Sequence, residues 1–201
     1  MRLPSDAALI LVDLQLAIDD PRWGPRNNPE AEQAIAALLA AWREEGLPIV
    51  HVRHDSVEPD SPYRPDRPSH AFKPETAPRP GEAVVGKSAH SAFVGTSLEA
   101  ALDGLGATTL VICGVLTHNS VEATARHAAD LGYRVFVVAD ACWAVALADG
   151  GGGLWPAEIV HRVALACLAG EYAAIVDTEM TLAAARLAKT RLRARETPGD
   201  G

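Results

Sequence analysis

The sequence predicts an α/β fold with a mostly parallel sheet. Short, nearly continuous apolar runs alternate with segments of helical periodicity, and strands buried on both faces have this appearance in parallel sheets. Strands that alternate with helices build a sheet with helices on both faces, because the crossover connections are right-handed. The 201 residues can bury the core of one such domain. We expect a single domain over residues 1–190 and a polar tail over residues 191–201.

The first elements follow this alternation. Residues 7–14, AALILVDL, form an apolar strand, and residues 30–45 form an amphipathic helix that Gly46 ends. Residues 48–53 form a second strand. The proline-rich segment 54–81 has no periodicity of its own, and unstructured segments of this length inside a domain are usually functional loops. We expect this loop to supply walls of a pocket.

The second half of the chain repeats the alternation of strand and helix. Strands are predicted over residues 83–86, 108–113, 133–139 and 172–176. Helices are predicted over residues 96–105, 121–129, 156–168 and 178–190. The glycine run at residues 150–153 is a flexible connection within this half.

The composition excludes several classes of partner. Asp and Glu outnumber Lys and Arg by 26 to 18, and the net charge of −8 argues against nucleic acid or an anionic membrane. No apolar run approaches the length of a membrane span, and the N-terminus lacks the layout of a signal peptide. Three cysteines are too few, and odd in number, for a disulfide framework. We therefore expect the reducing environment of the cytoplasm. The phosphate-binding patterns GxxxxGKS/T and GxGxxG are absent, and we expect no cofactor.

Three chemically distinct residues follow three different predicted strands. Asp13, Lys87 and Ser120 lie at or just beyond strand ends that share one edge of a parallel sheet, where open α/β folds bind ligands. Lysine is rarely buried without a partner, so Lys87 is expected to pair with Asp13. Ser120 begins a helix, where backbone N–H groups can stabilise negative charge. Serine at a helix start is usually an ordinary N-cap, and on spacing alone the N-cap is the preferred interpretation of Ser120.

Four motifs together resemble the isochorismatase-like superfamily, which includes nicotinamidases, N-carbamoylsarcosine amidohydrolases and isochorismatases. They are ALILVDLQ, GKSAHSAF, VICGVLTHNSVEATARHAADLGYRVFVVADAC and PAEIVHRVALACLAGEYA. The resemblance covers nearly the whole chain. It implies a Rossmann-like, three-layer α/β/α sandwich around a mostly parallel six-stranded sheet. It also implies a small-molecule substrate and a homodimer or higher homo-oligomer.

The resemblance assigns roles to the three strand-end residues. It implies that Asp13 is the acid/base, that Lys87 is its partner, and that Ser120 occupies the nucleophile position. It further implies a non-proline cis peptide between Val115 and Leu116. This peptide would aim the N–H groups of Leu116 and Ser120 at an oxyanion.

One departure from the family pattern bears on the mechanism. Cysteine hydrolases of the family carry Cys where this chain has Ser120, in the stretch GVLTHNSVEAT. A thiol with a reference pKa of about 8.5 is activated more easily than a serine hydroxyl, which normally needs a histidine-type base. His118 is one candidate base, and Cys142 one alternative nucleophile. Some isochorismatases lack the cysteine and use the aspartate as a general acid on a vinyl ether, without a covalent step.

We therefore predict a hydrolase of a small amide, carbamoyl or enol-ether metabolite. The alternative is a catalytically impaired family member that acts as a metabolite-binding or assembly module. Candidate pocket residues are Gln15, Trp23, His54, Phe93, His118 and Trp143. Nicotinamidases have an Asp-x-His metal pair where this chain has His54-Asp55-Ser56. His54, Asp55 and His70 do not have the spacing of a known metal-binding motif, so we predict no metal.

Overall fold

The central feature is a fully parallel sheet of six strands. The computed structural model describes residues 1–196, so the last five residues of the predicted tail lie outside it. The strands follow the order β3-β2-β1-β4-β5-β8, and each neighbouring pair is parallel. Their bounds are β1 Ala8–Val12, β2 Ile49–His54, β3 Ala83–Lys87, β4 Thr109–Val115, β5 Arg134–Trp143 and β8 Ala174–Val176. The predicted α/β/α sandwich with six strands is confirmed.

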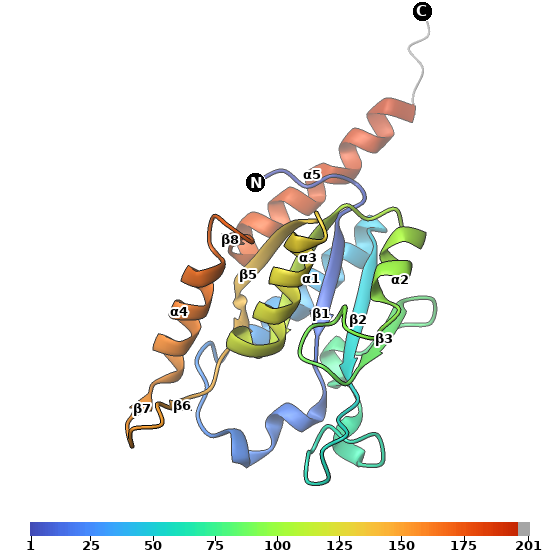
Figure 1. The fold of residues 1–201 in the computed structure, drawn as a ribbon. Coiled ribbons are helices and arrows are strands. Elements are labelled where there is room, and N and C mark those ends of the chain that lie inside the picture. Colours follow the sequence, from blue (N-terminus) through green and yellow to red (C-terminus); the bar gives the residue numbers. More distant parts are fainter. Residues whose placement is uncertain (197–201) are drawn as a thin grey trace, which may run out of the picture.

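Helices cover both faces of the sheet (Figure 1). Helices α1 (Ala31–Glu45) and α5 (Thr178–Glu196) pack together on one face, and α3 (Glu122–Asp130) packs with α4 (Ala157–Leu168) on the other. Helix α2 (Leu98–Gly104) connects β3 to β4, and α3 connects β4 to β5, so both connections cross the sheet toward β8. Because such connections are right-handed, α2 and α3 lie on the same face. No described helix is both long and apolar enough to cross a membrane.

Helix α5 continues beyond its predicted end at residue 190, as far as Glu196. The added segment, RLRARE, consists of good helix formers, and the first helix-breaking pair, Pro198-Gly199, comes only after it. Residues 191–196, predicted as part of a polar tail, therefore belong to α5.

Strand β5 also differs from the prediction, because it continues past residue 139 to Trp143. Its register against β4 shifts between the pair Ile112–Val137 and the pair Gly114–Cys142. Such an irregularity keeps a strand in the sheet while extra residues bulge out of the ladder. A short antiparallel hairpin of β6 (Leu147–Ala148) and β7 (Leu154–Trp155) follows, and the predicted glycine run 150–153 lies in its connection.

Strand β1 is the centre of the core, and all five of its residues are buried. It pairs with β2 on one side and with β4 on the other, and Val12 lies opposite both Val52 and Gly114. Gly114 has a φ of +121°, and a Cβ on it would stand 2.3 Å from the carbonyl oxygen of Val12. Only glycine allows the two strands to approach this closely at the point where β1 delivers Asp13.

We expect Gly114→Ala to lower the free energy of unfolding by about 3 kcal/mol or more, because left-handed strain and a backbone clash add together. Urea unfolding followed by far-UV circular dichroism measures the change. Gly104→Ala is the matched control, since Gly104 ends α2 with open space around the position of a Cβ. The control is expected to unfold within about 1 kcal/mol of the wild type. Equal stability of the two variants would contradict the argument.

Candidate active site

The three strand-end residues converge on one ammonium group. Lys87 Nζ donates to Asp13 Oδ2 at 2.8 Å and to Ser120 Oγ at 3.1 Å. A third acceptor is the carbonyl oxygen of Ala89, at 3.1 Å. The ion pair predicted between Lys87 and Asp13 is confirmed. Lys87 is only 2% exposed, so these protein acceptors replace the water that an ammonium would otherwise require.

His54 completes the surroundings of the ammonium. It lies beside Lys87 in the sheet register, and its Nδ1 is 3.3 Å from Nζ. Burial and the neighbouring Lys87 charge lower the pKa of His54 below its usual value, so the imidazole is uncharged at neutral pH. An ammonium can only donate, which makes Nδ1 the acceptor and places the imidazole proton on Nε2.

Only one of the two carboxylate oxygens of Asp13 accepts a hydrogen bond from a described residue. Oδ2 accepts from Lys87, whereas Oδ1 is buried without a hydrogen-bond partner among the described residues. The residue has a left-handed backbone, with a φ of 54°, and its N–H donates to the carbonyl of Val52. A buried carboxylate oxygen without a donor is costly, so Oδ1 is suited to accept from a bound ligand or water.

Ser120 is not a helix N-cap. It lies inside a π-helical turn, η5 (Thr117–Val121), and α3 begins only at Glu122. Its hydroxyl oxygen accepts from Lys87, and Val121, the residue at the cap of α3, makes no side-chain capping bond. The N-cap interpretation is therefore wrong, because the π turn moves the start of α3 past the serine. The non-proline cis peptide expected between Val115 and Leu116 is present.

Asp13, His54 and Ser120 line a cavity of about 220 Å³, and Lys87 lies behind them rather than on its wall. This is less than the roughly 300–1,000 Å³ of drug-sized sites, which indicates a small ligand. The predicted residues on its wall are Asp13, Trp23, His54, Leu116 and Ser120. Residues that the sequence analysis did not single out complete the lining: Ile18, Ser56, Glu58, Ser61, Tyr63, His90, Val115 and Asn119.

The proline-rich loop supplies part of this wall, as predicted, through Ser56, Glu58, Ser61 and Tyr63. Tyr63 is buried, and its hydroxyl lies 3.5 Å from the carbonyl oxygen of Asp13. An apolar aromatic within a polar loop was the one sequence signal that could have identified it. Nothing in the local sequence distinguishes Glu58 from the other acidic residues of the loop.

Two predicted pocket residues instead hold the framework. Gln15 is fully buried, and its amide exchanges hydrogen bonds with the backbone N–H and carbonyl of His54 while also donating to the carbonyl of His70. Trp143 is buried at the end of β5, where the guanidinium of Arg26 lies 4.3 Å from its ring centroid. Neither residue lines the cavity, because each is turned toward neighbouring segments of the fold.

Two further predicted pocket residues lie elsewhere. Phe93 packs against His127 and Tyr133, with ring centroids 5.3 and 5.8 Å apart. His118 lines a separate apolar groove formed with β6, β7 and α4, and its buried Nδ1 has no partner among the described residues. It is therefore not placed to act as a base for Ser120. The π turn explains this outcome, since it directs His118 and Ser120 to different cavities.

Cys142, the cysteine considered as an alternative nucleophile to Ser120, is also excluded by its position. Cys142 lies fully buried inside β5 opposite Gly114, and burial raises its pKa to about 12. It packs in the core and does not reach the cavity.

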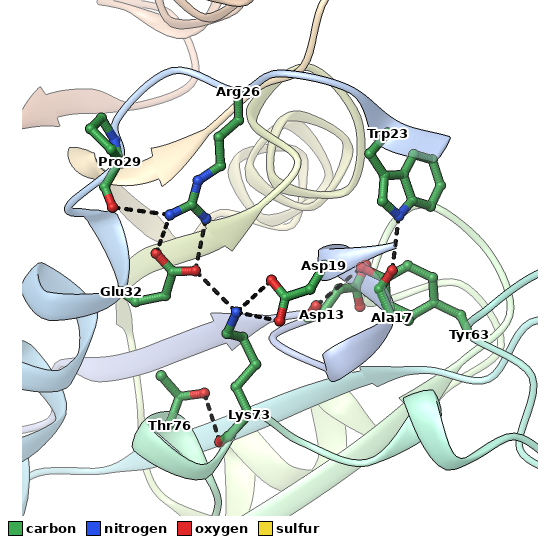
Figure 2. A network of polar contacts seen from close by, with 10 residues as sticks. All are labelled: Asp13, Ala17, Asp19, Trp23, Arg26, Pro29, Glu32, Tyr63, Lys73 and Thr76. Atoms are coloured by element: carbon green, nitrogen blue, oxygen red, sulfur yellow. Dashed lines mark hydrogen bonds and ion pairs between the residues drawn. The ribbon is translucent and has the colours of Figure 1, made fainter. Parts of the chain in front are cut away.

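A polar network ties the walls of the cavity together (Figure 2). Lys73, from the proline-rich loop, donates to both carboxylate oxygens of Asp19 at 2.7 and 2.8 Å and lies 3.1 Å from Glu32 of α1. Arg26 also pairs with Glu32. The Trp23 indole N–H donates to the carbonyl of Ala17 at 2.8 Å. The loop and the segment that carries Trp23 are thus joined to each other and to α1.

The candidate metal ligands do not form a cluster. His70 Nε2 lies 2.7 Å from Asp55 Oδ1, which also accepts from Arg53. Within residues 1–196, no three His, Cys, Asp or Glu side chains come together in a way that could hold a metal ion.

Comparison with known proteins identifies similar sequences and structures. Residues 7–180 match the isochorismatase domain. The isochorismatase family protein YrdC of Bacillus subtilis is 36% identical over 175 residues, covering 87% of this chain and 94% of its own. A streptothricin hydrolase of Streptomyces noursei is 38% identical over 67% of this chain and 48% of its own. The structure of a hydrolase of the isochorismatase family from Chromobacterium violaceum is 51% identical, with a TM-score of 0.89, over 93% of this chain and 97% of its own.

We expect Lys87→Met to destabilise the protein by about 3–5 kcal/mol, because it leaves the buried Asp13 carboxylate without its counter-charge. The double variant Asp13→Asn/Lys87→Met should recover at least half of that loss, since no buried charge remains and asparagine tolerates the left-handed backbone. Urea unfolding of the three proteins measures both effects. If the double variant is no more stable than Lys87→Met, the unpaired Asp13 carboxylate is not the cause of the lost stability.

Proposed function

We propose that this chain hydrolyses a small amide, carbamoyl or enol-ether metabolite in the cavity beside Asp13, Lys87 and Ser120. The chain belongs to the isochorismatase family of hydrolases. The observation that carries this proposal is the buried Asp13 Oδ1, which has no partner among the described residues and belongs to a cavity-lining residue. A proton acceptor in that position is what general acid/base chemistry requires.

Lys87 and Asp13 divide the work of proton transfer. With an amide or carbamoyl substrate, Oδ2 stays bound to the ammonium, whereas Oδ1 takes a proton from an attacking water molecule and returns it to the leaving nitrogen. With an enol ether, the protonated carboxyl first gives its proton to the vinyl carbon, and Oδ1 then takes a proton from the water that adds to the resulting oxocarbenium ion. The ammonium remains a donor throughout, so it fixes the carboxylate in one orientation. His54 supports this arrangement, because its uncharged ring accepts from Lys87 without adding a second positive charge.

Ser120 acts without forming a covalent intermediate. A serine nucleophile needs a base in contact with its hydroxyl, but the partner of Ser120 Oγ is an ammonium, which has no lone pair to accept a proton. His54 contacts Lys87, and His118 lines the other groove. The hydroxyl therefore contributes hydrogen bonding, and the backbone N–H groups of Leu116 and Ser120 stabilise the developing oxyanion.

A relative supports hydrolysis as the reaction class. The similar protein of Streptomyces noursei is a streptothricin hydrolase. The small cavity of this chain favours a small substrate or a small reactive end of a larger one.

Asp13→Asn is expected to lower turnover of a small-amide, carbamoyl or enol-ether panel by about 10²–10⁴-fold, because it removes the acid/base group. Ser120→Ala should lower turnover by about tenfold, the size of the loss of one hydrogen bond and well below the loss expected at Asp13. Steady-state rates measure both effects, and exposed Asp60 provides the control variant Asp60→Asn, which should keep full activity.

Undiminished turnover in Asp13→Asn would exclude the proposed acid/base role. Tight metabolite binding with no turnover across the same panel would favour the alternative of a binding or assembly module. Equal losses in the Asp13→Asn and Ser120→Ala variants would point to a covalent serine route.

Ser120→Cys provides a separate test of the surroundings of this position. The Lys87 ammonium should lower the pKa of a thiol placed beside it, so amidase turnover is expected to rise about tenfold or more. The alkylation rate with iodoacetamide, measured against pH, reports the thiol pKa independently of turnover. Both proteins should carry Cys167→Ser, because Cys167 is exposed whereas Cys113 and Cys142 are buried. An alkylation midpoint near the reference value of about 8.5 would contradict this expectation.

A further inference from the structure

The charged groups around the cavity are unbalanced. Of the described residues that line it, Asp13 and Glu58 are acidic and none is arginine or lysine. The charge of Asp13 is offset by Lys87 directly behind it, at 2.8 Å. The lowered pKa of His54 leaves that ring uncharged at neutral pH. The Glu58 carboxylate is therefore the acidic group of the wall that lacks a counter-charge.

Glu58 is free to meet a ligand. Its residue is exposed, and its carboxylate makes no hydrogen bond or ion pair with any other described residue. Two arginines donate to the loop backbone just after Glu58, and among the described residues neither forms an ion pair with the Glu58 carboxylate. Arg22 donates to the carbonyl of Asp60 and pairs with Asp20, and Arg67 donates to the carbonyl of Pro59.

Aromatic rings form the rest of this side of the cavity. Trp23 and Tyr63 lie edge to face, with centroids 6.3 Å apart, and Tyr63 meets His54 in the same way at 5.5 Å. The Trp23 indole N–H is bound to Ala17, and Figure 2 shows the two rings next to each other. Tryptophan and tyrosine faces attract cations, and this attraction strengthens where water is excluded.

We propose that Glu58 and Trp23 form a subsite for a positively charged group of the substrate, such as an ammonium, amidinium or guanidinium. This inference rests on the proposed function and narrows its substrate class to small, cationic amides or carbamoyl compounds. A carboxylate-bearing substrate would meet Glu58 with a like charge.

Three isosteric probes that differ in charge test the subsite. Benzamidinium, benzamide and benzoate are titrated into the wild-type protein and into Glu58→Gln, Glu58→Lys and Asp60→Asn, with binding followed by calorimetry or ligand-observed NMR. Asp60 is an exposed carboxylate of the same loop that does not line the cavity, so Asp60→Asn is the matched control. Binding is measured without turnover, so its outcome is independent of the Asp13→Asn activity test.

We expect benzamidinium to bind the wild type at least tenfold more tightly than benzoate. Glu58→Gln should weaken benzamidinium by about twofold to fivefold, as expected for an exposed charge pair, and leave benzamide unchanged. Glu58→Lys should reverse the order of benzamidinium and benzoate, and Asp60→Asn should change none of the three. The inference is overturned if benzoate binds the wild type as tightly as benzamidinium, if Glu58→Gln has no effect, or if benzamidinium does not bind.

Discussion

The buried ammonium of Lys87 is the constraint on which the site depends. An ammonium shielded from water must be surrounded by acceptors, and here they come from the end of β1, from the end of β2, from Ala89 and from η5. These segments are far apart in the chain. They meet because parallel strands end at one edge, and because the registers of β1, β2, β3 and β4 agree at that edge. Fold and site are therefore specified by the same strand pairing.

The backbone at this edge of the sheet also helps to place Asp13 and Ser120 beside Lys87. Gly114 lets β4 approach Val12 closely, and the next residue of β1, Asp13, leaves the strand with a left-handed φ. After β4, the π turn η5 precedes α3, so Ser120 lies beside the ammonium rather than at the helix cap. Gln15 holds the backbone of His54 from behind. Asp13, Lys87 and Ser120 are thus all buried at this edge of the sheet.

The walls of the cavity have a different origin. They come from the proline-rich loop and from the segment around Trp23, which the network of Lys73, Asp19 and Glu32 joins to α1 (Figure 2). Loops tolerate substitution more readily than strand ends. In the proposed mechanism, this division separates the acid/base group at a strand end from Glu58 and the aromatic rings, which lie on the segments that form the wall.

The sequence by itself determined the alternation of strands and helices, the parallel sheet, and the meeting of Asp13, Lys87 and Ser120, because apolar periodicity and strand-end position are local properties of the chain. It could not place Phe93 or His118, since loop conformation and the π turn decide which way those rings face. It could not place Trp143 either, because that ring is buried by the continuation of β5. It also did not reveal Tyr63 or Glu58 as wall residues, nor the continuation of β5 that buries Cys142. Only the tertiary structure decided these points, because side chains on loops and irregular turns take their direction from long-range contacts that leave no periodic trace in the sequence.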